Sequence, residues 1–509
     1  MAKAKKPRAP KKGKGAEKRM TRIDANPILE VDMAEFAKDQ YGRYGRFTLE
    51  SRAIPDFRDG FKPSSRRILW SAHTLGFNHK SKLSKAMRIV GDTIGRYHPH
   101  GDASAYSSMV SLTNVGIKVN NIRHGLIQGS GNWGSLVDSR PAAARYTEAR
   151  LSKLSDEMLF NKFYLPAMQK VQNFDSTAEE PLVLPALLPQ LFLNGDFGIA
   201  AGASARSPLF EADSLIDLLE LAYKGEELTP KLLAKTLRVT NTYGGVESKA
   251  SAKSEGRRDL FSKKKGSIEL DSVYTYDEKK RTLTFTGFAN TDFEKILTKV
   301  PLISGVHDVW DASTPQDIFG KIVVVLKKQA DNRHKRTFDA VVKFMRAKIN
   351  YQFNFTRRFI DEDGQASAKM RAMTMPEVLT AWVKWRIGLE KRACKYWITE
   401  DEKEIRRLNL LMQACDLIDF IMALLKDKKM KSSGDVYEAY AKKAKVELEE
   451  AKYVMNRPII SLRNLAKNEL LEDRKKVEAN MAKLQARHDK PRKHMVRQLA
   501  DFRPLLKGN

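Results

Sequence analysis

Residues 142–152 read AAARYTEARLS and place Tyr146 directly after Arg145, at the end of the stretch that carries the most specific signals for fold and chemistry. A tyrosine can attack a phosphodiester when positive charge or a base activates its phenol, whose ordinary pKa is ~10. Arg145 and, further along, Arg150 supply such charge, and other arginines can stabilise the phosphorane. An Arg-Tyr pair alone is weak evidence, because most such pairs only pack on the surface.

Three further motifs precede this one. RAIPDFRDGFKPSSRR (52–67) gathers five cations around a turn, VGDTIGRYHPHGDASAY (90–106) holds two histidines, and QGSGNWGS (128–135) is rich in glycine. The glycines of the last motif formally match G-x-G-x-x-G, but Pro141 blocks the long helix that a dinucleotide site would open. We therefore predict a glycine turn that passes close to other backbone. No Walker A sequence occurs, so this chain has no such ATP site.

His98 and His100 flank Pro99, which keeps His98 out of helical geometry. In an extended segment the two rings point to opposite sides, so joint chelation of one metal ion is disfavoured. Three interpretations stay open: contact with a phosphate or oxyanion, which we favour, buried structural histidines, and a metal site. We assign no metal ligand in this chain.

Composition limits the class of protein. A chain of 509 residues is too long for one ordinary domain, and 42% hydrophobic residues suffice for packed cores. We find no apolar run of ~20 residues and no signal peptide, so we expect a cytoplasmic protein without a membrane partner. Two cysteines, Cys394 and Cys415, make no disulfide framework.

Charge points to the partner. The 91 Lys and Arg residues exceed the 62 Asp and Glu residues, which gives a net charge of +29. Such an excess favours a polyanion, because neutralising phosphates releases condensed counterions. Residues 1–20 contain nine of the cations among Ala, Pro and Gly, so we predict a disordered basic arm there.

Periodicity predicts the coarse layout. We expect helices at 64–77, 85–95 and 210–238, a loop or linker at 240–266, a hairpin of SVYTY (272–276) and TLTFTGF (282–288), and a strand at KIVVVL (321–326). From Pro376 nearly fifty residues run in helical periodicity, and 465–488 would be the returning helix of an antiparallel coiled coil.

The four motifs, in this order and spacing across residues 50–206, resemble the breakage-reunion (A) subunit of the type IIA DNA topoisomerases, gyrase and topoisomerase IV. Within the family the chain looks most like the medium subunit of tailed-bacteriophage topoisomerase II. The resemblance implies an α+β multidomain fold. Its parts would be a disordered basic arm (1–25), a winged-helix domain with the catalytic tyrosine (26–185), a tower domain with a β-sheet (186–370), a coiled coil with a helical exit gate (371–490) and a basic tail (491–509).

The resemblance also implies residue roles. Tyr146 matches the nucleophile and Arg145 its activating neighbour, while His98 and His100 match a pair near the scissile phosphate. Ile199, in NGDFGIAAGASA (194–205), matches the residue that wedges between base pairs to bend DNA. The positions that bind or polarise the DNA backbone are Arg52, Lys62, Arg66 and Arg67, of which Arg52 is assigned to catalysis.

Partners and cofactors follow from the same resemblance. We expect a homodimer on double-stranded DNA, closed through the DNA gate and the exit gate, together with a large ATPase and TOPRIM subunit. Mg²⁺ and ATP would be bound mainly by that partner. The activity would be relaxation and decatenation without supercoiling, because no DNA-wrapping pinwheel or Gln-Arg-Arg-Gly-Gly box is present. We expect the protein to act in the cytoplasm of a bacterial host during phage infection.

Three positions depart from the family pattern. Ser65 stands where a histidine usually precedes the paired arginines, which puts that contact in doubt. Ala103 and Ser107 stand where bacterial enzymes have the hydroxyl and the acid that anchor quinolones, so we expect weak inhibition by that class.

Two rival functions are weaker. A tyrosine recombinase would need a spaced Arg, His-x-x-Arg and Tyr set near its C-terminus, whereas Tyr146 lies early in the chain. An architectural DNA-binding protein fits the charge and the basic arm, but it would need no nucleophile.

Overall fold

The computed structural model describes residues 32–113, 124–134, 140–200, 203–314, 317, 319–362, 366–427, 430, 432–457 and 467–507. The chain divides into two compact units, residues 1–47 and residues 48–509. The first contains most of helix α1 (Met33–Thr48), and the basic arm expected at residues 1–25 lies outside the described residues. The second contains three large hydrophobic cores and a small apolar cluster. The first of these cores holds the helices and strands that position the candidate site.

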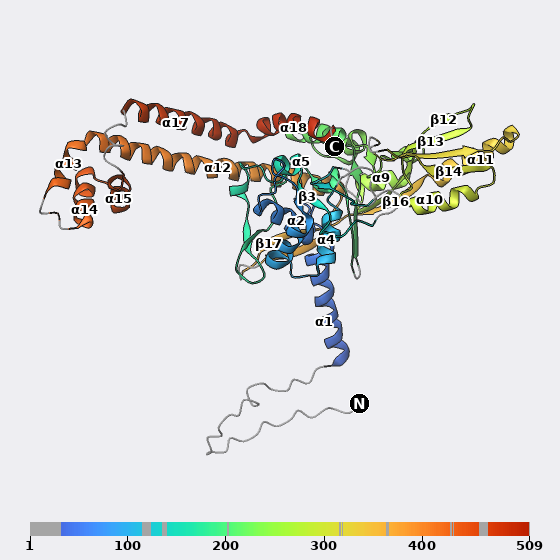
Figure 1. The fold of residues 1–509 in the computed structure, drawn as a ribbon, viewed down its shortest axis with the longest axis horizontal. Helices are drawn as coiled ribbons and strands as arrows, with labels where there is room; N and C mark the ends of the chain where they lie inside the picture. The colour runs from blue at the N-terminus through green and yellow to red at the C-terminus, as the bar shows by residue number, and fades with distance from the viewer. Residues whose placement is uncertain are drawn as a thin grey trace, which may run out of the picture. The chain divides into compact units, whose positions relative to one another are not determined.

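The motifs of residues 52–152 lie on short helices around a small antiparallel sheet, whose strand order is β1-β3-β2 (Figure 1). Helix α2 (Pro63–Thr74) confirms the helix expected at 64–77 and begins with a proline, whose missing N–H would have no helical partner there. The other elements are β1 (Ser84–Lys85), α3 (Ala86–Asp92), α4 (Asp102–Val110), β2 (Ile127–Ser130), β3 (Glu148–Leu151), α5 (Lys153–Met158), β4 (Lys170–Gln172) and β5 (Glu179–Pro181).

A seven-stranded sheet follows, in the order β6-β7-β16-β11-β10-β9-β8. The helical prediction for 210–238 is confirmed by α7 (Ala212–Lys224) and α8 (Pro230–Thr236), and Gly225 ends α7 in the left-handed region at φ 105°. The strands are β6 (Asp196–Ala200), β7 (Ala203–Ser207), β8 (Leu209–Phe210), β9 (Val239–Thr240), β10 (Val246–Glu247), β11 (Lys265–Asp271) and β16 (Ala347–Gln352), with the further helices α6 (Gln190–Leu193) and α9 (Glu255–Ser262).

The expectation of a loop at 240–266 was wrong. The segment contains strand β10 and helix α9, and it leads into β11, which pairs with β16 over six residue pairs. Glycines make this packing possible: a Cβ on Gly266 would lie 2.3 Å from the Leu260 backbone nitrogen. Gly266 therefore permits close backbone packing and does not mark a linker.

A four-stranded sheet in the order β12-β13-β15-β14 contributes one side of the second core. Strands β12 (Val273–Asp277) and β13 (Thr282–Gly287) confirm the predicted hairpin, and β15 (Ile322–Leu326) confirms the predicted strand. The sheet is completed by β14 (Val306–Asp311) and packs with α10 (Phe293–Lys299) and α11 (Asp331–Phe344).

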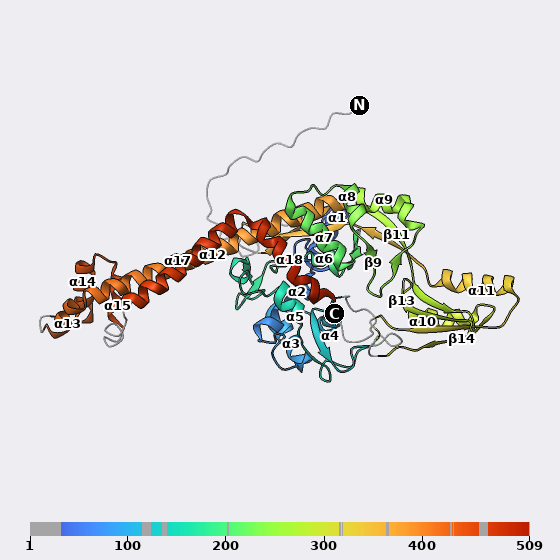
Figure 2. The same ribbon diagram turned by 90° about the horizontal axis from the view of Figure 1, so that it is seen from above.

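The long helix and its return are also confirmed. Helix α12 (Met375–Asp416) begins with a capping box between Thr374 and Glu377, and Leu417 separates it from α13 (Ile418–Lys426). Helix α17 (Lys467–Asp489) lies beside α12 and runs the other way (Figures 1 and 2). The antiparallel register is set by the pairs Lys467–Asp416, Asn480–Asp401 and Arg487–Glu390.

The third core is helical and lies where α12 ends. Helices α13, α14 (Ser433–Ala444) and α15 (Leu448–Met455) pack around the buried Tyr440. In the described part of the chain no single helix combines the length and apolar character that a membrane span needs, although the bent pair α12 and α13 together does.

The predicted basic tail at 491–509 needs a correction. Residues Pro491–Lys507 form helix α18, which packs against α7. Its buried residues Met495, Leu499, Phe502 and Leu506 belong to the first core, which also contains the motif helices. Arg503 pairs with Asp217 and Glu220 at 2.7 and 2.9 Å. The basic residues occupy the exposed side of an amphipathic helix.

Candidate active site

Tyr146 lies on a short turn just before β3. Its side chain is 64% exposed, and its backbone N–H donates to the Ala143 carbonyl at 2.8 Å. The first residues of α3 hold the turn, since Met87 N–H donates to Ala144 and Ala86 N–H to Thr147. The phenol is therefore presented outward from an anchored backbone.

Arg145 acts directly on this phenol. Its guanidinium carbon lies 4.7 Å from the centre of the Tyr146 ring. A hydrogen bond from Arg145, and then its charge, lower the pKa of Tyr146 below its ordinary value. Lowering that pKa raises the phenolate fraction at neutral pH, which is what a nucleophile needs.

The glycine turn supports the same loop. Gly131 and Gly134 have φ values of 92° and 99°, which only glycine adopts readily. A Cβ on Gly131 would lie 3.8 Å from the Tyr146 carbonyl oxygen and 3.7 Å from the Thr147 Cα. Tyr106 adds a hydroxyl hydrogen bond to the Ala142 carbonyl at 2.7 Å. The turn therefore does pass close to other backbone, and that backbone belongs to the tyrosine loop.

The expectation that the two histidine rings point to opposite sides was wrong. His100 N–H donates to the His98 carbonyl at 2.7 Å, and this tight turn brings the ring centres to 4.3 Å. The π-helical segment η2 (Thr93–Tyr97) leads into the turn through a bond from His98 N–H to the Thr93 carbonyl. A second π-helical segment, η1 (Leu49–Ala53), carries the exposed Arg52.

Arg67 fixes the protonation of His98. Its Nη1 lies 3.0 Å from His98 Nδ1, and because a guanidinium can only donate, Nδ1 accepts and the ring proton sits on Nε2. Burial, then the charges of Arg67, His100 and Arg52, lower the pKa of His98 to about 4. His98 is thus a neutral donor at pH 7, suited to a phosphate oxygen.

This assignment predicts the titration of His98. In nitrogen NMR of histidine-labelled protein, the His98 ring should stay neutral until the pH approaches about 4. The unfolded chain takes up that proton near 6.5, so stability falls as the pH drops between these values. A His98→Asn variant identifies the resonance. A midpoint near 6.5 would contradict the Arg67 contact.

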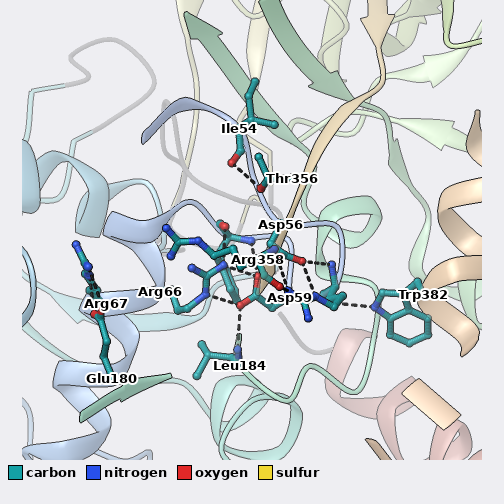
Figure 3. Close-up of polar contacts among 12 residues, drawn as sticks. Ile54, Asp56, Asp59, Arg66, Arg67, Glu180, Leu184, Thr356, Arg358 and Trp382 are labelled. Atoms are coloured by element: carbon teal, nitrogen blue, oxygen red, sulfur yellow. Dashed lines mark hydrogen bonds and ion pairs between the residues drawn. The ribbon is translucent and has the colours of Figure 1, made fainter. Parts of the chain in front are cut away.

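The arginines of residues 52–67 divide into two groups. Arg66 is 2% exposed and forms two hydrogen bonds with Asp59, at 2.6 and 2.9 Å (Figure 3). Arg58 is also buried and holds Asp56 in the same way. The expectation that Arg66 contacts DNA does not fit this burial, because the buried carboxylate of Asp59 occupies its guanidinium.

Arg67 is the surface member of the pair. Two hydrogen bonds of 2.6 and 2.7 Å attach it to Glu180 on β5, and about a fifth of its side chain is exposed. Glu180, Asp56 and Asp59 were not predicted from the sequence. The acids interspersed at positions 56 and 59 were the available signal for the last two.

Ile199 lies near the tip of the hairpin formed by β6 and β7 and is 67% exposed. A Cβ on Gly198 would lie 2.1 Å from the Ala53 carbonyl oxygen, so that face of β6 packs on the body and Ile199 faces away. Lys62 holds the hairpin, with its ammonium donating to the Phe197 carbonyl and pairing with Asp196 at 3.4 Å. The alternative that Ile199 is a core residue is excluded by its exposure.

The structure joins some expected residues and leaves others apart. Arg67, His98, His100 and Arg52 form one cluster, and Arg145 and Tyr146 form another. Among the described residues no hydrogen bond, ion pair or ring contact connects the two clusters. Arg150 belongs to neither, since it bonds Gln128 and the Ser81 carbonyl.

Comparison with known proteins gives consistent matches. A family model that describes the A subunit of DNA gyrase/topoisomerase IV matches residues 52–501. The chain is similar to the A subunit of DNA topoisomerase 4 from Bacillus subtilis, at 30% identity over 424 residues, which cover 81% of this chain and 49% of the relative. It is also similar to the A subunit of DNA gyrase from Metamycoplasma arthritidis, at 27% identity over 515 residues, which cover 97% of this chain and 54% of the relative. The chain thus spans about half the length of these relatives.

Proposed function

The chain belongs to the family of DNA gyrase and topoisomerase IV A subunits, and on that premise we propose that it is the DNA-cleaving and rejoining subunit of a type II DNA topoisomerase. The observation that carries the proposal is the exposed Tyr146 phenol with the Arg145 guanidinium across its ring. An exposed tyrosine with a lowered pKa, on a basic chain, is the arrangement that attack on a DNA phosphodiester requires.

The reaction is a transesterification. The Tyr146 oxygen forms a bond to phosphorus while the bond from phosphorus to the 3′ oxygen breaks, which leaves a 5′-phosphotyrosyl link. The phenol gives up its proton and the released 3′ oxygen takes one up. Because one phosphodiester bond is exchanged for another, the reverse reaction reseals the strand without consuming ATP. His98 Nε2–H and the charges of Arg52 and Arg67 would bind phosphate oxygens near the reacting strand.

Ile199 supports a bent DNA path. An exposed apolar side chain at a hairpin tip can enter a base step and kink the duplex. Ile199→Ala should reduce the bend angle and cleavage more than affinity, with little change in melting temperature because the side chain is exposed. Energy-transfer measurements on end-labelled duplexes give the bend.

The control is Leu302→Ala, which removes a similarly exposed aliphatic side chain elsewhere. An unchanged bend in the Ile199 variant, or an equal loss in the Leu302 variant, would refute the wedge.

We propose the family's domain roles for the observed elements. Residues 26–185 would form the winged-helix DNA gate and 186–370 the tower. The paired helices α12 and α17, with the helical third core, would form the coiled coil and exit gate of a homodimer. Two copies would then place two tyrosines on opposite strands.

Mg²⁺ and ATP are proposed to bind a partner subunit with the ATPase and TOPRIM parts. Within the described residues no three His, Cys, Asp or Glu side chains gather as metal ligands. A metal ion would stabilise the leaving 3′ oxygen, and we expect the chain alone to cleave weakly or not at all.

The finer proposal is a subunit of the tailed-bacteriophage type, active in the cytoplasm of a bacterial host. With its partner, Mg²⁺ and ATP it should relax supercoils of both signs and unlink catenanes without adding negative supercoils. The test mixes these components with circular DNA and looks for protein-linked double-strand breaks. DNA binding without any such breaks, in the presence of an active partner, would favour an architectural protein.

Quinolone response is a separate prediction. Ala103 and Ser107 are exposed one turn apart on α4, so the first position lacks the hydroxyl and the second lacks the acid that anchor the drug. The combined Ala103→Ser and Ser107→Asp variant should trap cleavage complexes at roughly tenfold lower drug concentration, a gain of ~1.4 kcal/mol. Trapping of the unaltered enzyme at concentrations effective on bacterial gyrase would contradict this.

A further inference from the structure

The buried network beneath the arginine motif has more cations than acids. Three carboxylates lie here, and each accepts two hydrogen bonds from a single arginine. The pairs are Arg58 with Asp56 at 3.0 and 2.7 Å, Arg66 with Asp59 at 2.6 and 2.9 Å, and Arg67 with Glu180 at 2.6 and 2.7 Å. Each of these acids is therefore paired with its own arginine, and a fourth guanidinium nearby has only their longer-range attraction.

Arg358 is the fourth arginine of the network and has no acid of its own. Its backbone is fixed, since its N–H donates to Asp56 at 2.8 Å and its carbonyl accepts from Arg58 at 2.6 Å. Among the described residues its guanidinium makes no hydrogen bond or ion pair. In Figure 3 its side chain extends from β17 (Asn354–Ile360) toward α2, which carries Arg66 and Arg67.

The environment of Arg358 is unfavourable for its charge. Burial, then the charges of Arg66 and Arg67, lower the pKa of Arg358 to about 10, so it remains charged at pH 7. A half-buried cation beside other cations is stabilised when an anion arrives. The adjacent Arg67 already contacts His98, whose Nε2–H is a phosphate donor.

We propose that Arg358 binds a phosphate of the cleaved duplex, so that strand β17 adds a cation to the phosphate-binding surface of Arg67 and His98. This rests on the proposed function. Strand β17 (Asn354–Ile360) pairs with β18 (Ala366–Ala372) and is attached to the motif through the bridge between Thr356 and Asp56. DNA binding would therefore connect two chain segments about 300 residues apart.

The test is the salt dependence of duplex binding by the full chain. Arg358→Gln should weaken binding and reduce the slope of log affinity against log salt by about 0.9, the value for one lost phosphate contact on duplex DNA. The matched control is Arg357→Gln, which removes the same charge from the adjacent, exposed position on the opposite face of β17. It should change the slope less.

Stability separates this role from a structural one. Removing an unpaired cation should leave the melting temperature of Arg358→Gln unchanged or higher, and Arg358→Lys should keep most of the salt slope. A marked drop in melting temperature, or a wild-type slope in Arg358→Gln, would overturn the proposal. So would a defect confined to binding of inorganic tripolyphosphate, which would indicate a small-anion site. Failure of the unaltered chain to form covalent adducts in the presence of Mg²⁺ and an active partner subunit would instead refute the proposed function.

Discussion

Tyr146→Phe is expected to abolish covalent attachment of the chain to DNA. The substitution removes the only atom proposed to bond to phosphorus, and neither Arg145 nor His98 can replace it. Duplex affinity should stay within a few-fold, because phosphate contacts dominate such an interface. The melting temperature should hold, since the side chain is 64% exposed. Denaturant-trapped adducts on labelled DNA, formed in the presence of Mg²⁺ and the partner subunit, give the measurement.

Tyr106→Phe is the matched control for this experiment. The Tyr106 hydroxyl bonds the Ala142 carbonyl and the Thr147 hydroxyl, on either side of the tyrosine turn. Its loss should loosen the turn and lower adduct yield without eliminating adducts. Adducts that persist in Tyr146→Phe would show that another residue is the nucleophile, and complete loss only in Tyr106→Phe would point to Tyr106.

Local periodicity in the sequence was sufficient to predict an element that is long or that alternates regularly between apolar and polar residues. The 42 residues of α12 and the hairpin of β12 and β13 were predictable because their patterns repeat within one segment. Strands β9 and β10 have two residues each, too few to show alternation, and β11 pairs with β16 from about 80 residues away. Helix α18 did carry a signal, an apolar residue every three or four positions from Met495 to Leu506, hidden by its basic composition.

In the candidate site too, local motifs could be predicted from the sequence and contacts between distant segments could not. Tyr146, Arg145 and the histidine pair could be found from motifs, because their order and spacing are local. The separate roles of Arg66 and Arg67 could not be predicted, because adjacent arginines look alike in a sequence. Burial separates them, and it depends on the Leu184 backbone N–H donating to Asp59 and on Glu180 accepting from Arg67, over 100 residues away in each case.

Substitution of the two adjacent arginines is expected to have different effects. Arg66→Gln leaves the fully buried Asp59 without its cation, and such a change costs ~3–5 kcal/mol. Arg67→Gln should destabilise the protein less, because Arg67 is partly exposed and glutamine can still donate to Glu180. Its main defect should be weaker DNA binding with a smaller salt slope. Thermal denaturation and duplex titration of both variants give the comparison.

A double variant tests whether Arg66 acts through its ion pair alone. Replacing Arg66 by Met together with Asp59 by Asn removes both charges and keeps a side-chain oxygen that can accept from the backbone N–H groups of Phe61 and Leu184. The melting temperature should recover most of the loss seen in Arg66→Gln, and DNA affinity should stay near that of the unaltered chain, because neither side chain reaches the surface. A stable Arg66→Gln variant with weakened DNA binding would contradict this and restore Arg66 as a DNA contact.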